Sequence, residues 1–551
     1  MKKIRRMLVT TALPYSNRDL HLGHILEHCI TDFWTRFQKM RGNDCLSICA
    51  DDSHGAPIMV EARKRNIDPE QHITHMKQMH IDDLKAFGVH YDHYSSTHTQ
   101  TNKDLCDLIY RSLKDEGSIV NRFLKQYYCE KDLMFLPDRF VQGSCPRCDA
   151  PAQYGDSCDK CGAVYTPEEL KNPQCSMCKG TPVIKSSEHF FVRLSPYKDF
   201  LREWVAGHTP PAIANKLLEW LDADLADWCF TRDFPYFGFE LPDVKGKFYY
   251  VWFDAPIGYI ATTKEWCEAN NRHFDEFWKS KDCEIYHNIG KDIFYFHSLF
   301  WPTMLKAASF TLPKEIWVHG MLTSNGEKLS KSKGTFINAK TYLEYLDPEY
   351  LRYYFACKLS SSIDDIDLNF NDFSSRVNSD LVGKITNILS RSAQLLNKKM
   401  DSHLGAFNEE GNLLFSHFLD RSEVIAGHYE KRDFAKAMLE IRSLADLANK
   451  YADDNAPWRE WEKNPEGART VLTVCINLFR ILAMYLKPIL PHYVEKVENF
   501  LGDSAYTWES LTNKLENRTL RPYLHILSRL DDKKISSLIA DSAAIQKLHA
   551  E

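Results

Sequence analysis

Residues 1–55 carry the pattern that most restricts the fold, because strand-like and helix-like stretches follow one another at short range. Residues 7–13 form an apolar run that ends at Pro14, and apolar residues recur at helical spacing over 21–42. A second apolar strand, 46–50, ends in the polar stretch 51–55. This order predicts a βαβ unit of a parallel sheet, and such sheets bind ligands at the carboxyl ends of their strands.

The length of the chain requires more than this one unit. At 551 residues it exceeds what a single hydrophobic core serves, so roughly three or four packed units are expected. Hydrophobic residues at 44%, charged residues at 26% and a mean hydropathy of -0.42 are typical of a soluble globular protein. The basic N-terminus is followed by an apolar run too short for a signal peptide or a membrane span. We expect a cytoplasmic chain without membrane contact.

Charge and cysteine content restrict the function further. The net charge of -6 gives no general attraction to nucleic acid, so any RNA binding must use local patches. Sixteen cysteines could form a disulfide framework, but six of them make three CxxC pairs within 145–178. Reduced thiols around a metal ion explain this concentration better.

The cysteine-rich stretch interrupts the α/β pattern. Residues 129–178 are rich in turns, and the α/β pattern resumes at 247–254 and 284–289. A connector at 360–367 precedes a long region with helical periodicity and few strand signals. We therefore expect an inserted domain inside the α/β fold, followed by a helical domain.

A histidine motif, His21-Leu22-Gly23-His24, lies at the expected start of the first helix. Gly23 permits close approach of a ligand, the two imidazoles offer hydrogen-bond donors, and the helix N-terminus adds N–H groups and a favourable dipole. The motif indicates a cradle for the phosphates of ATP. Taken alone, such a four-residue match more often marks two surface histidines on a helix.

A lysine-rich loop, KLSKSKG at 328–334, follows an Asn-Gly turn. A loop of this kind can close on a triphosphate and stabilise the charge of the leaving pyrophosphate, although a solvated basic loop has the same composition. The two motifs in this order resemble the HIGH and KMSKS signatures of class I aminoacyl-tRNA synthetases.

Four further segments narrow the resemblance. They read ALPY (12–15), ADDSHG (50–55), WFDAPIGY (252–259) and GKDIFYFH (290–297). Together they are similar to the methionyl-tRNA synthetase family over nearly the whole chain. The resemblance implies a ligase that activates L-methionine with ATP to methionyl-adenylate and transfers it to the 3′-terminal adenosine of tRNA(Met), including initiator tRNA.

The resemblance also assigns site residues position by position. The methionine pocket falls on Ala12, Leu13, Tyr15, Asp52, Trp252, Ala255, Pro256, Tyr259, Ile293 and His297, with Asp52 holding the substrate ammonium. ATP, with Mg²⁺, falls on His21, His24, Gly290, Asp292, His319 and Lys331, and the catalytic set is His21, Gly23, His24, Lys328 and Lys331. Aromatic rings, a Tyr hydroxyl or an imidazole can contact or donate to a thioether sulfur.

Two of the CxxC pairs are spaced for one metal ion. Cys145 and Cys148 are followed after nine residues by Cys158 and Cys161. Four thiolates at this range can hold one Zn²⁺ tetrahedrally, which is a closed structural site.

The third pair, Cys175 and Cys178, needs two more ligands. Relatives with two zinc ions place another knuckle upstream, where this chain has Cys129 and Asp132, with Asp132 in the place of a second cysteine. A carboxylate oxygen can ligate zinc, so the sequence leaves a second site open.

In the helical region, the resemblance places the anticodon-reading face on Asn387, Arg391, Pro457 and Trp458. Loop bases are read by stacking on aromatic planes and by hydrogen bonds to their edges, which suits a CAU anticodon. Gly383 stands where some relatives have Asn, so the contact at that position stays open.

The expected fold is a Rossmann-like α/β catalytic domain with a zinc-binding insertion, followed by an all-α anticodon-binding bundle. The expected domains are the first catalytic half (1–115), the insertion (116–235), the second catalytic half (236–325), the loop and connector (326–380) and the helical domain (381–551). Many bacterial relatives continue into a dimerising domain; without one, a monomer is expected.

Two rival functions remain at this stage. A sister synthetase for isoleucine, leucine or valine shares both signatures but usually carries a large editing insertion. A zinc-ribbon RNA-binding protein with an inactive α/β domain would bind tRNA without forming an adenylate. Absence of methionine-dependent pyrophosphate exchange would favour either rival.

Overall fold

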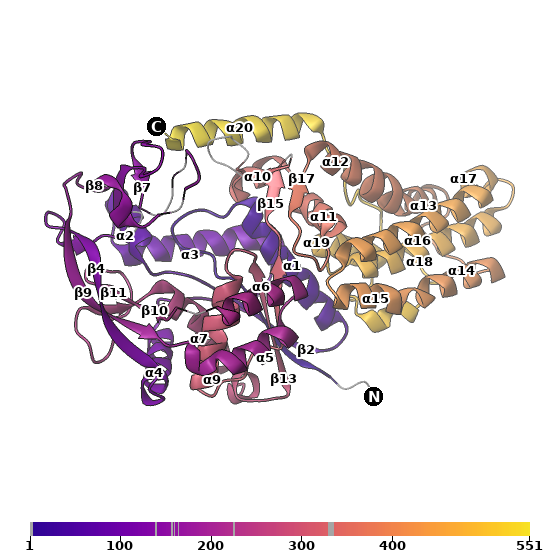
Figure 1. Ribbon diagram of the computed structural model, residues 1–551. Coiled ribbons are helices and arrows are strands. Elements are labelled where there is room, and N and C mark those ends of the chain that lie inside the picture. Colours follow the sequence, from indigo (N-terminus) through magenta and orange to yellow (C-terminus); the bar gives the residue numbers. More distant parts are fainter. Residues whose placement is uncertain are drawn as a thin grey trace.

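The computed structural model describes residues 4–137, 140–155, 158, 160–163, 165–223, 226–324, 326–328 and 336–550. Figure 1 shows three regions side by side: a β-rich region at the left, a sheet flanked by helices in the middle and a helical bundle at the right. The C-terminal helix α20 (Asp532–Ala550) crosses along the top and packs against α10 (Ala339–Tyr345).

The central sheet confirms the Rossmann-like prediction. It has five strands, all parallel, in the order β14 (Glu315–His319), β13 (Cys283–Gly290), β1 (Arg6–Thr11), β2 (Asp44–Asp51) and β3 (His93–Ser96). The inner strands are buried almost throughout, as expected for a parallel sheet that helices cover on both faces.

Helices cover the two faces according to the alternation of side chains along each strand. On β1, Met7 and Val9 pack in the cluster that includes α1 (Leu22–Met40), whereas Leu8 packs with α4 (Gln100–Asp115) and α7 (Val251–Ala269). The remaining helices of this region are α2 (Ala56–Lys64), α3 (Pro69–Ala86), α8 (Asp275–Trp278) and α9 (Trp301–Ala307).

The α/β pattern does not resume at 247–254 as a strand of this sheet. Only β12 (Lys247–Tyr249) is extended, and it pairs with β11 (Thr231–Asp233) in a separate two-stranded ribbon. Helix α7 then begins at Val251. The run is apolar on all sides, and such a run cannot be assigned to a buried strand or a buried helix from periodicity alone.

The insertion is built on one long antiparallel ribbon, β4 (Ile119–Cys129) with β9 (Val183–Val192). Its flanking elements are β5 (Met134–Phe135), β10 (Trp228–Cys229), α5 (Lys198–His208) and α6 (Pro211–Asp222). A small sheet of β7 (Gln153–Tyr154), β6 (Val141–Ser144) and β8 (Lys171–Cys175) carries the cysteine pairs.

The connector closes against the end of the central sheet. β15 (Leu322–Ser324) pairs with β17 (Ile366–Leu368) and β16 (Glu327–Lys328). At Gly320, which precedes β15, any Cβ would lie 1.9 Å from the carbonyl oxygen of Asp364. This close approach of two backbones requires glycine. The helices that follow are α11 (Pro348–Lys358) and α12 (Phe370–Ser375).

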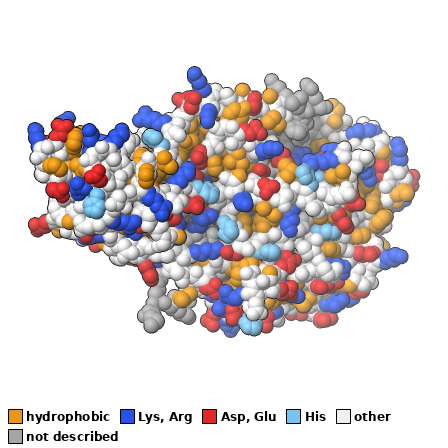
Figure 2. Space-filling model, turned by 180° about the vertical axis from the view of Figure 1, so that it is seen from behind, with side chains coloured by type: hydrophobic (Ala, Val, Ile, Leu, Met, Phe, Trp, Pro, Cys, Tyr) orange, Lys and Arg blue, Asp and Glu red, His pale blue; other side chains and the backbone are white. Residues whose placement is uncertain are grey.

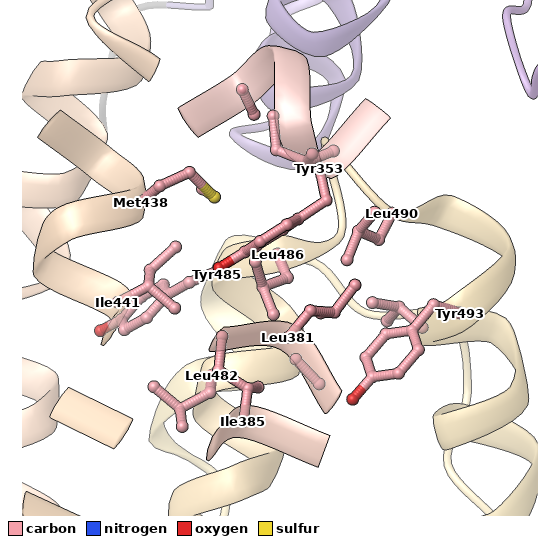
Figure 3. Packing of buried hydrophobic residues seen from close by; sticks show 14 of the residues in the cluster. Tyr353, Leu381, Ile385, Met438, Ile441, Leu482, Tyr485, Leu486, Leu490 and Tyr493 are labelled. Atoms are coloured by element: carbon pink, nitrogen blue, oxygen red, sulfur yellow. The ribbon is translucent and has the colours of Figure 1, made fainter. Parts of the chain in front are cut away.

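The helical domain confirms the all-α prediction. It begins with a π-helix, Arg376–Thr386, and continues with α13 (Asn387–Lys399), α14 (Glu409–Asp420), α15 (Ser422–Glu430), α16 (Phe434–Asn455), α17 (Pro457–Glu460), α18 (Pro465–Leu486) and α19 (Pro491–Leu501). Figure 3 shows its core, in which Met438 and Ile441 of α16, Leu482 of α18 and Tyr353 of α11 converge.

One helix among the described residues, α18, is long and apolar enough to cross a membrane. Of its most apolar stretch, 89% is buried inside the protein. The apolar character of α18 is therefore that of a central core helix.

Candidate active site

A cavity of about 840 Å³ opens at the carboxyl ends of four parallel strands. Its wall includes Ala12 just after β1, Asp52 just after β2, Gly290 at the end of β13 and His319 at the end of β14. This is the edge at which open α/β sheets bind ligands.

Most of the predicted ligand-binding residues lie in this wall. They are Ala12, Leu13, Tyr15, His21, Gly23, His24, Asp52, Trp252, Gly290, Asp292, Ile293 and His319. Four predicted residues of the methionine pocket, Ala255, Pro256, Tyr259 and His297, are buried close by but do not line the cavity. The cavity thus joins segments that are separated by more than 300 residues in the sequence.

The histidine motif forms the N-terminal cap of α1. The backbone N–H of Gly23 donates to Nδ1 of His21 at 3.0 Å, and the backbone N–H of His21 donates to Nδ1 of His24 at 3.2 Å. The two rings stack with centroids 3.7 Å apart. Because Nδ1 accepts in each ring, the proton of the neutral form is on Nε2 in both.

His24 is held neutral by its surroundings. Burial, together with the neighbouring His21 and His28, lowers the pKa of His24 well below its ordinary value. The motif therefore offers N–H donors to an anion at the helix end without requiring a buried positive charge.

Asp52 is half-buried in the cavity wall, and its carboxylate has one fully buried oxygen. Among the described residues, its Oδ1 atom has no hydrogen-bond partner. Burial raises the pKa of Asp52 well above its ordinary value, and the nearby Asp254 and Asp51 raise it further. A buried oxygen of this kind is costly unless a donor or a positive charge satisfies it.

A glycine shapes the same corner of the cavity. Gly55, which is in a left-handed conformation with φ of 120°, follows the Asp52 segment. A Cβ there would lie 2.7 Å from the hydroxyl of Tyr15. Any side chain at this position would thus displace Tyr15 from the cavity wall.

Behind the cavity, Tyr259 and His297 form a buried pair. Nδ1 of His297 lies 3.3 Å from the carbonyl oxygen of Ile293, and its Nε2 lies 2.9 Å from the hydroxyl of Tyr259. Burial lowers the pKa of His297 to about 4, so the ring is neutral, with Nδ1 donating and Nε2 accepting. The Nδ1 proton of His297 is donated to Ile293 and the hydroxyl proton of Tyr259 to His297. Neither group donates to a substrate sulfur atom in this arrangement, which differs from the expectation from the sequence.

An aromatic wall stands beside this pair. Trp252 stacks on Phe296 with centroids 4.1 Å apart and an interplanar angle of 1°. Trp252 lines the cavity and also meets His297 edge to face at 6.5 Å. An apolar, aromatic surface and the Asp52 carboxylate thus belong to the wall of one cavity.

Sequence reasoning missed several residues of the wall. Glu27 lies on α1, one turn beyond His24, and its Oε1 is 3.6 Å from Nε2 of His319. The i, i+3, i+6 spacing from His21 could have indicated Glu27. Arg232, Tyr236 and Phe336 also line the cavity, but they come from distant segments that carry no local signal.

The lysine-rich loop cannot be placed in the same way. Lys331 lies outside the described residues, and Lys328 is described only as a backbone position of β16. The strand preceding the loop, β15, starts with Leu322, which lines the cavity.

The two cysteine clusters each bring four ligand atoms together. In the first, Cys145 and Cys161 have sulfur atoms 3.8 Å apart, and those of Cys148 and Cys158 are 3.6 Å apart. Tetrahedral zinc–thiolate bonds of about 2.3 Å place sulfur atoms roughly 3.8 Å from one another. All four atoms lie within 4.8 Å, so this cluster could hold a metal ion.

The second cluster consists of Cys129, Asp132, Cys175 and Cys178, again with all ligand atoms within 4.8 Å. Oδ2 of Asp132 is 3.1 Å from the sulfur atoms of both Cys129 and Cys175. The sulfur atoms of Cys129 and Cys178 are 3.4 Å apart. Asp132 thus occupies the fourth corner of a site that the sequence left open.

The helical domain brings the predicted anticodon residues together at its far end. The guanidinium carbon of Arg391 lies 3.8 Å from the ring centroid of Trp458, and Arg391 also pairs with Asp453 at 3.1 Å. Pro457 begins α17, directly after Ala456 in the left-handed conformation. Asn387 is the first residue of α13.

Gly383, which stands where some relatives have Asn, is explained by its local backbone. This residue lies within the π-helix, and a Cβ there would be 2.8 Å from the carbonyl oxygen of Asn378. The wider turn of the π-helix therefore disfavours an Asn at this position in the present backbone.

Two family models match the chain. The model described as tRNA synthetases class I (M) matches residues 7–393, and the anticodon binding domain of methionyl tRNA ligase matches 403–522. The chain belongs to the class I (M) tRNA synthetases. This finding confirms the resemblance noted from the sequence.

Similar proteins agree with the family. A curated methionine–tRNA ligase of Bdellovibrio bacteriovorus is 49% identical over 99% of this synthetase and 80% of the relative. A Mycobacterium tuberculosis methionyl-tRNA synthetase in complex with methionyl-adenylate has a TM-score of 0.78 at 23% identity, covering 96% and 100% of the two chains. The apo form of that enzyme gives 0.72 at 21% identity, covering 96% and 99%. These structures share the fold of this synthetase.

Proposed function

We propose that this synthetase is a methionine–tRNA ligase, which joins L-methionine to tRNA(Met), including initiator tRNA, at the expense of ATP. The observation that carries the proposal is one cavity whose wall holds two chemically different sets of groups. One set is the Asp52 carboxylate, which has a buried oxygen without a partner, with aromatic surfaces, and the other is a helix N-terminus capped by two histidines. The proposal treats the first set as the amino-acid end and the second as the ATP end. The 49% identical relative, itself named a methionine–tRNA ligase, supports the choice of amino acid.

At the amino-acid end, Asp52 binds the substrate ammonium. A charge-assisted hydrogen bond satisfies its Oδ1 atom and favours the ionised form of the carboxyl group. The thioether side chain lies against Ala12, Leu13, Tyr15, Trp252 and Ile293, with Ala255, Pro256, Tyr259 and His297 supporting the pocket from behind. Aromatic faces contact sulfur favourably.

At the ATP end, the N–H groups of His21 and His24 and the end of α1 hold the phosphates. Gly290, Asp292 and His319 form the opposite wall, where Asp292 lies so close to Gly290 that a Cβ would be 2.7 Å from its Oδ1. Lys328 and Lys331 of the KLSKS motif supply positive charge to the leaving phosphates. Mg²⁺ bound with ATP supplies further charge neutralisation.

The reaction proceeds in two steps in one site. The methionine carboxylate attacks the α-phosphorus of ATP, and the bond from this phosphorus to the oxygen that bridges to the β-phosphate breaks. Pyrophosphate leaves, and methionyl-adenylate remains in the site. Positioning and charge stabilisation by His21, His24 and Lys331 lower the barrier. A hydroxyl of the terminal ribose of tRNA then attacks the acyl carbon, and AMP leaves.

Both cysteine clusters hold structural zinc in this account. The first has four thiolates and the second three thiolates and Asp132, and neither set has an extra position for a reactive water. We expect two zinc ions per chain by elemental analysis and one for Cys175→Ser. A count of one in the unaltered protein, held by the first cluster, would contradict the second site.

The remaining assignments complete the proposal. The tRNA anticodon CAU is read by Asn387, Arg391, Pro457 and Trp458, and the domain boundaries are those given above. The protein is a monomer of the cytoplasm in this account. Light scattering at micromolar concentration tests the oligomeric state, and a dimer would contradict it.

Charging of tRNA transcripts tests the overall function. With ATP, Mg²⁺ and labelled methionine, we expect acylation of a transcript of tRNA(Met) with anticodon CAU, and strongly reduced acylation when the anticodon is changed. Binding of the transcript without acylation would indicate the inactive RNA-binding rival instead.

A further inference from the structure

A second pair of a cation and a tryptophan lies beside the Arg391–Trp458 pair. The Nζ atom of Lys399 is 4.7 Å from the ring centroid of Trp461. Both cations come from α13, and both rings come from the segment that contains α17. The arrangement therefore repeats along one face of the helical domain.

Trp461 has the same degree of burial as Trp458 and packs against the same core. Both rings are half-buried and pack with one side against the core of the helical domain. They are three residues apart, which corresponds to roughly 5 Å along a helix. Neighbouring nucleotides of one loop can span such a separation, so two rings at this spacing suit successive bases.

The charge around Trp461 is local. Lys399 is exposed, and so are Lys398, Arg459 and Lys463, but Glu460 and Glu462 are exposed beside them. On the face shown in Figure 2, Lys and Arg side chains are likewise interspersed with Asp and Glu over the whole molecule. A contact at Trp461 depends on stacking and on single cations, because exposed acidic side chains lie among the exposed basic ones in this segment.

Figure 1 places α17 at the tip of the helical domain, next to α13 and α16 and far from the central sheet. The position of the ring thus suits a partner that reaches the tip of the bundle.

We propose that Trp461 and Lys399 form a second nucleotide-binding position of the anticodon face, at which a loop base next to the anticodon stacks on Trp461 and Lys399 binds its phosphate. The inference rests on the proposed reading of CAU by Trp458 and Arg391, and it extends that surface by one base. A planar ring beside a single cation is the arrangement with which proteins bind unstacked bases.

Two substitutions of Trp461 separate stacking from packing. Trp461→Leu removes the aromatic plane but keeps apolar bulk, and Trp461→Phe keeps a smaller plane. We expect Trp461→Leu to raise the KM for tRNA at least about 5-fold and Trp461→Phe to restore most of it, as base stacking predicts. ATP–pyrophosphate exchange and the midpoint of thermal unfolding should stay unchanged.

The contribution of Lys399 is measured by the salt dependence of tRNA binding. We expect Lys399→Gln to reduce the slope of log affinity for tRNA against log salt concentration by about one, as loss of one phosphate contact predicts. A matched control is Trp266→Leu, because Trp266 is also half-buried and lies 5.6 Å from the guanidinium carbon of Arg272, but at the end of α7. This variant should bind tRNA normally.

The outcomes distinguish the inference from the proposed function. If Trp458→Leu weakens tRNA binding and Trp461→Leu does not, the nucleotide-binding position at Trp461 is contradicted, whereas the proposed anticodon face at Trp458 is supported. If neither matters, the proposed anticodon face fails. If Trp461→Leu also slows pyrophosphate exchange or charging of an acceptor-stem minihelix, the ring has only a structural role, which overturns the inference.

Discussion

Asp52 is the residue on which recognition of the amino acid depends in this account. Asp52→Asn keeps the size of the side chain and removes its charge. We expect the KM for methionine to rise by roughly 30-fold or more, because a charge-assisted hydrogen bond is worth about 2–3 kcal/mol. The fold should be equally or more stable, since a buried unsatisfied carboxylate is removed.

Pyrophosphate exchange and thermal unfolding measure the two effects. Asp243→Asn serves as the control, because Asp243 pairs with Lys114 at the surface and does not line the cavity. An unchanged KM for Asp52→Asn would remove the ammonium site from the account.

His297 makes the stability depend on pH. Its pKa is about 4 in the folded protein and about 6.5 in the unfolded chain, so the unfolded chain binds a proton first as pH falls. The contribution of the neutral ring is fully present above pH 6.5 and is lost as pH falls to 4, by up to about 3 kcal/mol. We expect the free energy of unfolding, measured with denaturant, to fall less between pH 7 and pH 5 in His297→Asn than in the unaltered protein. An identical dependence of the unfolding free energy on pH in the two proteins would contradict the buried neutral ring.

Helix α11 connects the catalytic and helical domains through one buried side chain. Arg352 donates to Asp32 of α1 at 2.6 Å, to the carbonyl oxygen of Phe87 at 3.2 Å and to that of Ile489 at 2.7 Å. Asp32 also pairs with Arg36 at 2.7 Å, but the Arg36 side chain is partly exposed. We expect Arg352→Met to destabilise the protein by about 3 kcal/mol, because Asp32 keeps only this second partner.

The double substitution of Asp32→Leu with Arg352→Met tests this reading of the pair. Removing both charges should recover much of the lost stability in denaturant unfolding, since no buried charge remains unpaired. If the double variant is as unstable as the sum of the two single variants, packing and not charge pairing holds α11 in place.

At the level of elements, the sequence predicts best where local signals are strong. The strand, cap and helix from β1 to α1 follow their apolar spacing and the histidine cap closely. The segment of Trp252 was harder to assign, because an apolar run that is buried on all sides has the same composition in a helix and in a strand. The π-helix around Gly383 leaves no periodic signal.

At the level of the whole molecule, motifs predict which residues serve a site but not which ones share its wall. The resemblance supplied Asp52 and His24, and the fold brings them into one cavity. Arg232 and Phe336 were missed because only the packing of the insertion and the connector against the sheet brings them there. Likewise, Asp132 meets Cys175 only because the fold brings two distant segments of the insertion together.

ATP–pyrophosphate exchange with each of the twenty amino acids tests the central claim most directly. The account predicts exchange that depends on methionine alone, in the presence of Mg²⁺ and without tRNA. Exchange with another amino acid would keep the class I chemistry and contradict the methionine pocket. No exchange with any amino acid would contradict the adenylating site itself.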